Sequence, residues 1–287
     1  MPKIVWILLI GLLYSGCGRH GGESIFGDFV RPTLERDMTH TQALEYWKNL
    51  CDKDIKACAL LFVDPTIDDQ EQYLQSLQEI LKHYQNISSL YKGQCHSAES
   101  SAQKQACEVM AYASYKLWYS IYYVGYHKLN LQDSIQSFAK SLNISLPQPK
   151  YLQDYVRKAC ADDFFEPCLL NMAISIVSAA YYKTPIDEAE VFAMRNKILQ
   201  LTHSQLKADN SDIAILSTLL EMYRLLESYY QLIEAGSVSS ATLNKQKAKK
   251  AQNESARIME QYTSQLCKAG MQSACARQEY YEKYKEP

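Results

Sequence analysis

The sequence predicts an all-α protein built from αα-hairpins, on three observations. Only 10 of the 287 residues are glycine and 8 are proline, so strong helix breakers are rare. Long segments carry apolar side chains at helical spacing, and no useful run alternates between apolar and polar residues as a half-buried strand does. Cysteines also recur in close pairs between these segments. We therefore expect roughly ten or eleven helices that meet at short corners.

Four helices are expected before the clearest break in the chain, which lies at Pro147 and Pro149. They cover residues 39–51, 68–91, 106–129 and 131–142. Thr39 or Thr41 provides the N-cap of the first helix, because a threonine hydroxyl accepts a hydrogen bond from a free N–H group of the first turn. The second helix has one apolar stripe, formed by Tyr73, Leu74, Leu77, Ile80, Leu81, Tyr84, Ile87 and Tyr91. This stripe predicts one buried face.

Six further helices are expected after the break. They cover residues 151–160, 168–182, 186–208, 211–235, 241–267 and 274–287. Pro185 ends the second of these helices, and Ser211 provides the N-cap of the fourth. The segments 169–182 and 213–233 are apolar on more than one face, so we expect both at the centre of the fold. The lysine-rich segment 245–250 is expected at the periphery.

The N-terminal segment has the pattern of an export signal. Lys3 supplies a positive charge, and the apolar run 4–14 is eleven residues long. A membrane-spanning helix needs about 20 residues, whereas a secretory signal needs a shorter run. Ser15 and Gly16 then precede Cys17. This arrangement resembles the lipobox of bacterial lipoproteins, in which a signal peptidase cleaves before a cysteine that becomes lipid-modified. An ordinary cleaved signal with an incidental cysteine is the alternative.

The lipobox resemblance implies a domain organisation. Residues 1–16 would form a lipoprotein signal peptide, and residues 17–37 a tether anchored through lipid on Cys17. Residues 38–287 would form the α-helical hairpin repeat domain. Gly18 stands where lipoproteins retained in the inner membrane of enteric bacteria have aspartate. We therefore expect an outer-membrane lipoprotein of the cell envelope, facing the periplasm or the cell surface.

The cysteines beyond the N-terminal segment are predicted to form disulfides. The chain has nine cysteines, so an even number remains without Cys17. They form the close pairs Cys51/Cys58, Cys95/Cys107, Cys160/Cys168 and Cys267/Cys275. An even set of locally paired cysteines in an exported chain favours a disulfide framework. Free buried thiols are the alternative.

The pair at 160 and 168 illustrates what such a bond requires. On one continuous helix the two Cα atoms would lie about 12 Å apart, whereas a disulfide needs about 7 Å or less. The chain must therefore reverse between the cysteines. Pro167 here, and Gly270 in the last pair, are the candidate causes of reversal. Each bond would then link the corner of an αα-hairpin, and the pair at 95 and 107 fits a longer corner.

Two of the pairs lie in similar sequences. Both "YVRKACADDFFEPCLLNMAISIVSAAYY" and "YTSQLCKAGMQSACARQEYYEKY" have an aromatic and basic helix end, a cysteine, a short turn, a second cysteine and a helix ending in paired tyrosines. They resemble the disulfide-stapled Sel1-like repeats, which are relatives of tetratricopeptide (TPR) repeats in exported bacterial proteins. Lys268, Ala269, Gly270 and Ala274 stand at family-like positions. Because the repeat length is not constant, the resemblance implies an irregular Sel1/TPR-like repeat that binds protein or peptide on a concave face, not catalysis.

No catalytic residue, metal site or cofactor is predicted. The pattern SxxK occurs at Ser101–Lys104 and Ser137–Lys140, but the penicillin-recognising enzymes that use it also need a KTG-like element and an α/β core. The sequence contains no GxSxG, HExxH, P-loop or GxGxxG pattern. Its cysteine pairs lack the CxxC spacing of zinc knuckles and of thioredoxin-type motifs. The six histidines, at 20, 40, 83, 96, 127 and 203, are dispersed, and we expect them to be structural or solvated.

Charge and aromatic content limit the partners. The chain has 30 basic and 32 acidic residues, so no charge excess attracts nucleic acid. The run Lys245–Lys250 fits a solvated helix face, or a contact with anionic lipid or an acidic partner. The tyrosine-dense segment 118–126 fits helix packing, or a surface that binds peptide or glycan.

The predicted function is that of a non-enzymatic envelope lipoprotein whose helical hairpins form a protein-binding scaffold, in the assembly or regulation of an envelope complex. Its partners would be a protein of the cell envelope and, through lipid on Cys17, the membrane. The alternative is a periplasmic enzyme or a small-ligand-binding protein with an all-α pocket. Such a protein would have a deep pocket that contains titratable residues with shifted pKa values.

Overall fold

The computed structural model describes residues 38–96, 100–162, 164–182, 186–206, 213–240 and 242–284. Within these ranges the fold is all-helical and has no strand, which confirms the predicted fold class at this level. The expected signal peptide, Cys17 and the tether lie outside the described residues, as do Pro185 and Ser211. No helix of the described part is both long and apolar enough to cross a membrane.

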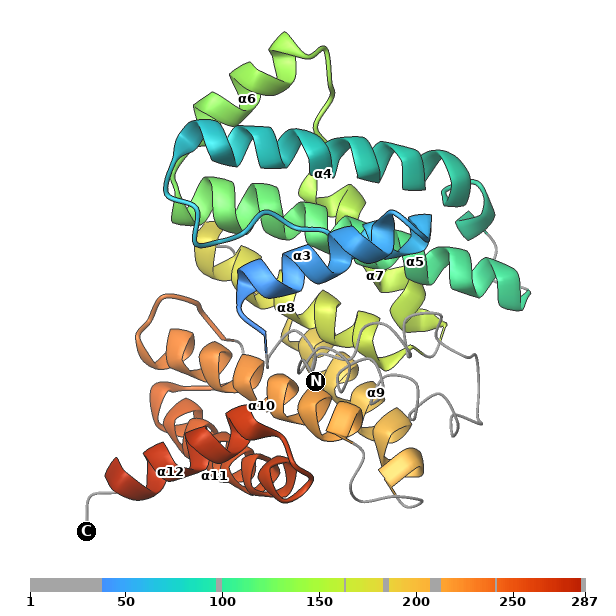
Figure 1. The fold of residues 1–287 in the computed structure, drawn as a ribbon. Helices are drawn as coiled ribbons and strands as arrows, with labels where there is room; N and C mark the ends of the chain where they lie inside the picture. The colour runs from blue at the N-terminus through green and yellow to red at the C-terminus, as the bar shows by residue number, and fades with distance from the viewer. Residues whose placement is uncertain are drawn as a thin grey trace.

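The helices are stacked on one another, and the C-terminal half of the chain continues the stack of the N-terminal half (Figure 1). The α-helices are α3 (His40–Cys51), α4 (Gln70–Tyr91), α5 (Ser101–Trp118), α6 (Gln132–Ser141), α7 (Pro149–Ala161), α8 (Phe165–Tyr182), α9 (Glu188–Leu206), α10 (Ile213–Glu234), α11 (Lys245–Lys268) and α12 (Gln272–Tyr284). The 3₁₀ helices η1 (Ile55–Leu60) and η2 (Gln94–His96) and the π-helix η3 (Tyr119–Lys128) lie between them. Figure 1 shows α6 at one end of the stack and α11 and α12 at the other.

Helix α5 is the centre of the N-terminal half. It packs against η1, α4, α7 and α8, and its side chains from Ala106 to Trp118 are buried except that of Tyr115. The predicted stripe of α4 faces this core, where its buried members are Tyr73, Leu77, Ile80, Leu81, Tyr84 and Ile87. Burial of this stripe confirms the helical period read from the sequence.

A buried hydrogen-bond node holds the point where α5 continues into the π-helix η3. The Tyr73 hydroxyl donates to the Ser120 carbonyl at 2.9 Å, and the Val63 N–H donates to the Ser120 hydroxyl at 2.9 Å. This hydroxyl in turn donates to the Lys116 carbonyl at 2.8 Å. The node joins α4, the segment after η1 and the α5–η3 junction, and it satisfies polar groups that burial would otherwise leave unpaired.

Helices α8 and α10 lie at the centre of the C-terminal half, as predicted. Leu169, Met172 and Ile176 of α8 belong to one buried cluster with residues of α9 and α10. Helix α11 packs on α10. Its first two turns expose Lys245, Lys247, Lys249 and Lys250. This exposure confirms the expected peripheral position of the lysine-rich segment.

The two predicted causes of chain reversal have different outcomes. Pro167 does not reverse the chain, because it lies in the first turn of α8, where a helix makes no use of the N–H that proline lacks. Gly270 does end a helix, and it has a φ of +94°. The Gly270 N–H donates to the Cys267 carbonyl at 2.9 Å, and the Met271 N–H donates to the Leu266 carbonyl at 3.0 Å. This is the left-handed helix ending that glycine favours.

Replacement of Gly125 tests the packing at the node. A Cβ atom at this position would lie 2.2 Å from the Tyr73 hydroxyl and 2.5 Å from Cδ1 of Ile135, and both side chains are fully buried. We expect Gly125→Ala to lower the free energy of unfolding by about 1–3 kcal/mol, as overpacked cores do. Chemical denaturation followed by circular dichroism measures this loss.

Gly93→Ala is the matched control for this change. A Cβ atom at Gly93 would have nothing within 4 Å, so the free energy of unfolding should change by less than about 0.5 kcal/mol. Equal stability of the two variants would contradict the packing described for Gly125.

Candidate functional site

All the predicted cysteine pairs of the described residues lie at disulfide-bonding distance. The Cα–Cα distance is 4.6 Å in each pair, which is within the range that a disulfide allows. Cys160 lies in the last turn of α7 and Cys168 in the first turn of α8. Cys267 and Cys275 occupy the corresponding turns of α11 and α12. These two pairs therefore close the corners of αα-hairpins, as expected.

The two N-terminal pairs are placed differently from the expected corners. Cys51 ends α3, but Cys58 lies in η1, so this pair closes a turn between an α-helix and a 3₁₀ helix. Cys107 lies in the second turn of α5, since the capping box of Ser100 and Gln103 starts this helix well before the cysteine. The pair Cys95/Cys107 thus links η2 to the body of α5. The sequence interpretation did not use the capping residues Ser100 and Gln103. They explain why Cys107 lies inside α5 and not at its start.

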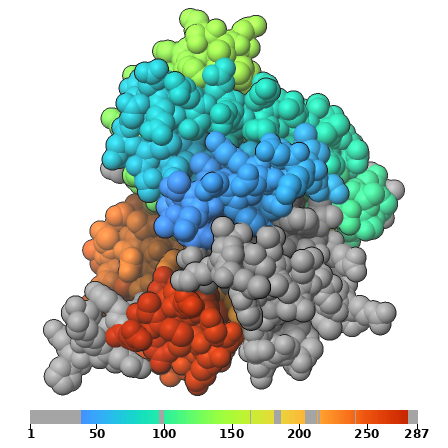
Figure 2. Space-filling view, viewed as in Figure 1, coloured from blue at the N-terminus to red at the C-terminus, as the bar shows by residue number. Residues whose placement is uncertain are grey.

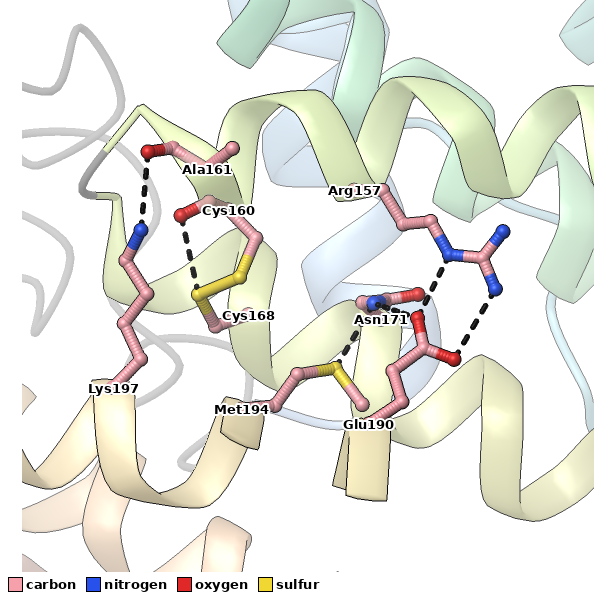
Figure 3. Close-up of a disulfide and its surroundings, with 8 residues drawn as sticks. All are labelled: Arg157, Cys160, Ala161, Cys168, Asn171, Glu190, Met194 and Lys197. Carbon is pink, nitrogen blue, oxygen red and sulfur yellow. Dashed lines mark hydrogen bonds and ion pairs between the residues drawn. A yellow bond between two sulfur atoms is a disulfide. The ribbon is translucent and has the colours of Figure 1, made fainter. Parts of the chain in front are cut away.

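Polar contacts hold α9 against the α7–α8 corner (Figure 3). Arg157 of α7 donates to both carboxylate oxygens of Glu190 on α9, at 2.8 and 3.2 Å. The hydrogen bond to Glu190 raises the pKa of the Arg157 guanidinium. The Asn171 amide also donates to Glu190, at 3.2 Å, and Lys197 donates to the Ala161 carbonyl at 3.0 Å. These contacts account for the orientation of α9 on the linked hairpin.

A row of aromatic side chains follows one face of α5 and η3, and we call it the aromatic row: Tyr115, Tyr119, Tyr123 and His127. Successive ring centroids lie 6.4, 5.1 and 5.9 Å apart. The three tyrosines are half-buried and His127 is exposed, whereas the other side chains from Ala106 to Tyr126 are buried. Between Ala106 and His127 the row is therefore the part of this central helix that reaches the protein surface.

Phe62 lies beside the aromatic row and contacts it through Tyr119. The Phe62 ring packs edge-to-face with Tyr119 at a centroid distance of 6.2 Å, and with the exposed His40 at 6.3 Å. The Lys116 ammonium lies 4.5 Å from the centre of the Phe62 ring, a cation–π distance. Because Phe62 is buried, the aromatic contacts, and not an exposed aromatic surface, extend from η3 to the start of α3.

The tyrosine-dense segment 118–126 both packs the core and forms part of the aromatic row. Tyr122 and Tyr126 are buried and pack edge-to-face at 5.1 Å. The Tyr122 hydroxyl donates to the Pro147 carbonyl at 2.8 Å. Tyr119 and Tyr123 lie on the surface-facing side. Helix packing, one of the two interpretations left open by the sequence, is confirmed for Tyr122 and Tyr126, and binding of peptide or glycan at Tyr119 and Tyr123 stays a prediction.

The structure also places a histidine beside the first cysteine pair. His83 of α4 is half-buried, and its Nδ1 lies 3.7 Å from Sγ of Cys51. Burial lowers the pKa of His83. Lys48 and Glu79 form an ion pair at 3.2 Å nearby, between α3 and α4. Sequence reasoning missed this contact because 32 residues separate His83 from Cys51, and no local pattern relates them.

The two SxxK patterns lie on helix surfaces. Ser101, Ser137 and Lys140 are exposed, and Lys104 is half-buried. A lysine that activates a serine or acts as a nucleophile needs to be desolvated. These positions therefore give no support to a serine nucleophile at either pattern.

The groups with shifted pKa values are mainly buried tyrosines. Burial raises the pKa of Tyr84 to about 12 and also raises the pKa of Tyr73. Burial opposes ionisation of Tyr151, but hydrogen bonds involving Lys92 and Tyr155 hold its pKa below the ordinary value. A shallow depression beside α6 is lined by Gln136, Ala139, Lys140, Asn143, Ile144, Ser145 and Leu146. None of the shifted tyrosines lines it.

Comparison with known protein families, curated proteins and solved structures finds no match for this chain. The functional argument therefore depends on the residues of the chain itself. Two features stand out among the described residues: the aromatic row of α5–η3, and the group of Cys51, Cys58 and His83.

Removal of one hairpin link tests the disulfide framework. Cys160 and Cys168 are separated by 8 residues, and a loop of this size contributes roughly 2.5 kcal/mol in the chain-entropy model. We expect the paired change Cys160→Ser and Cys168→Ser to lower the free energy of unfolding by about this amount, measured by chemical denaturation without reductant.

The paired change Cys267→Ser and Cys275→Ser provides the comparison, because this separation is also 8 residues. A similar loss is expected, since the entropic contribution depends on loop length. Unchanged stability in both paired variants would contradict a disulfide framework.

Proposed function

We propose that this chain is an exported envelope lipoprotein and that its helical hairpins form a scaffold for binding an envelope protein. The scaffold would act in the assembly or regulation of an envelope complex. The observation that carries the proposal is the aromatic row on α5–η3. From residue 106 onward it is the surface-facing side of a helix whose other sides are buried.

The chemistry of the aromatic row suits a protein partner. Tyrosine offers a large rigid ring together with a hydroxyl, and aromatic residues are enriched in protein interfaces and among their energetic hot spots. Tyr115, Tyr119 and Tyr123 are already held by their neighbours in the row. Binding would therefore cost them little further side-chain freedom.

The proposed location has two lines of support. Residues 1–16 have the pattern of a lipoprotein signal and are followed by Cys17. Lipid on Cys17 would anchor the chain to the outer membrane through the tether 17–37. The remaining cysteines are brought together in pairs, as is typical of proteins in oxidising compartments. On this proposal the scaffold faces the periplasm or the cell surface.

The proposed scaffold is an irregular Sel1/TPR-like repeat. The hairpins α7–α8 and α11–α12 have the cysteine placement that the resemblance implies, with one cysteine at the end of the first helix and one at the start of the second. The described α-helices range from 10 to 24 residues. This variation favours an irregular array over a regular solenoid.

A periplasmic enzyme or small-ligand-binding protein has less support. Such a protein would combine a pocket with titratable groups of shifted pKa. In the described part of the chain, the depression beside α6 and the shifted tyrosines lie apart. The scaffold proposal requires no such combination.

Site-specific crosslinking in cells tests the scaffold proposal. A photoreactive phenylalanine analogue is placed at Tyr123, and in a separate variant at Tyr151, which is 38% exposed on α7 and outside the aromatic row. We expect one dominant protein adduct from position 123 and none from position 151. The adduct should diminish in Cys17→Ala, because this change removes the proposed lipid anchor.

Mass spectrometry of the adduct identifies the partner. Equal adducts from both positions, or none from position 123 while the chain carries a co-purified small molecule, would overturn the scaffold proposal. If the adduct from position 123 persists in a soluble Cys17→Ala chain, the scaffold proposal stands. The result would then contradict the proposal that binding requires the lipid anchor.

A further inference from the structure

Cys51, Cys58 and His83 form a compact group of potential metal ligands. Their sulfur and imidazole nitrogen atoms all lie within 4.8 Å of one another. They come from three elements, because Cys51 ends α3, Cys58 lies in η1 and His83 lies on α4. Figure 2 shows the blue surface of α3 and η1 beside the cyan surface of α4. The tertiary packing of the N-terminal half, and not a local motif, assembles the group.

The spacing of Cys51 and His83 fits tetrahedral coordination, and the two sulfurs, which are bonded to each other here, would have to separate. Zinc binds thiolate sulfur at about 2.3 Å and imidazole nitrogen at about 2.0–2.1 Å. At a tetrahedral angle these bonds place a sulfur and a nitrogen ligand about 3.6 Å apart. The Cys51 Sγ and His83 Nδ1 atoms lie 3.7 Å apart. Little movement of α4 relative to α3 is needed for both to bind one ion.

Two features near the group favour a cation, whereas the Lys48 and Lys82 ammonium groups oppose one. Cys51 is the last residue of α3, and the C-terminus of a helix carries partial negative charge. Glu79 lies one turn before His83 on α4, and residues four apart share a helix face. Its carboxylate already binds a cation, the Lys48 ammonium, at 3.2 Å. Glu79 is not among the ligand atoms that lie within 4.8 Å of one another, so we assign the fourth coordination position to water.

We propose that Cys51, Cys58 and His83 form a redox-controlled site for a thiophilic divalent cation such as Zn²⁺. The site is closed while the cysteines form a disulfide, because thiolates, and not disulfide sulfurs, are the metal ligands. A dithiol reductant opens it by giving two electrons and two protons to the disulfide, and itself becomes a disulfide. Binding of the cation then releases the two thiol protons.

Oxidation reverses these steps. A disulfide oxidant accepts two electrons from the two thiolates and takes up two protons as it becomes a dithiol. The Cys51–Cys58 bond forms again, and the cation leaves. The site therefore couples the redox state of the pair to cation binding, and it does not depend on the proposed scaffold function.

The first pair differs from the pair Cys95/Cys107 in access and from the pair Cys267/Cys275 in ligands. Cys51 is half-buried, so a reductant reaches it more readily than Cys95 and Cys107, which are each 1% exposed. Cys267 and Cys275 are also half-buried, but among the described residues they belong to no such group with a histidine or carboxylate. They are the matched control within the chain.

Site-resolved alkylation tests the proposal on the full chain in detergent. A phosphine reduces the cysteines and is stopped while the far-UV circular dichroism still shows the native helix content. Iodoacetamide is then added with or without Zn²⁺, and mass spectrometry measures alkylation at each cysteine. We expect Zn²⁺ to slow alkylation of Cys51 and Cys58 by about tenfold or more, and to leave Cys267 and Cys275 unaffected.

Two variants identify the imidazole as a ligand. His83→Gln should abolish the protection of Cys51 and Cys58 by Zn²⁺, whereas His127→Gln, which changes an exposed histidine elsewhere, should retain it. Circular dichroism verifies that both variants fold. Protection of all reduced cysteines alike, protection unchanged in His83→Gln, or no protection of Cys51 and Cys58 would each overturn the proposal.

Discussion

The buried hydrogen bond from the Tyr73 hydroxyl to the Ser120 carbonyl is the contact on which the arrangement of the N-terminal half depends. It fixes α4 on the junction of α5 with η3, and the Val63 N–H joins the segment after η1 to the same residue. The ring of Tyr73 can reach this position only because Gly125 has no side chain. With α4 and η1 held in place, the face of α5–η3 that remains at the surface carries the aromatic row.

The same packing gives the cysteine pairs different roles. The pairs of α7–α8 and α11–α12 close hairpin corners, and Arg157 and Glu190 then set α9 against the first of these corners. The pair Cys51/Cys58 lies where α4 crosses α3 and η1, so it alone is grouped with a histidine among the described residues. The tertiary neighbours of the pairs therefore differ, and the proposed metal site would separate chemical reactivity from the stabilisation of corners along one chain.

The sequence predicts those features of the fold that depend on local pattern. The stripe of α4 has a helical period and is buried as predicted, and Gly270 ends α11 as glycine is expected to. The sequence favours Pro167 in the turn between two helices, but a proline fits the first turn of a helix equally well. The structure shows the second arrangement, because α8 begins at Phe165. Neither the π-helical form of 119–128 nor the approach of His83 to Cys51 was predictable, because both depend on packing between segments distant in sequence.

The claim that α5 is the rigid centre that carries the aromatic row is tested most directly by hydrogen exchange of the oxidised full chain. Amides in a buried central helix exchange only through large unfolding events, whereas exposed helix ends open locally. Peptides that cover 106–118 should therefore exchange most slowly, and peptides that cover the exposed start of α11, 245–250, should exchange much faster. Exchange of 106–118 at the rate of 245–250 would contradict the claim.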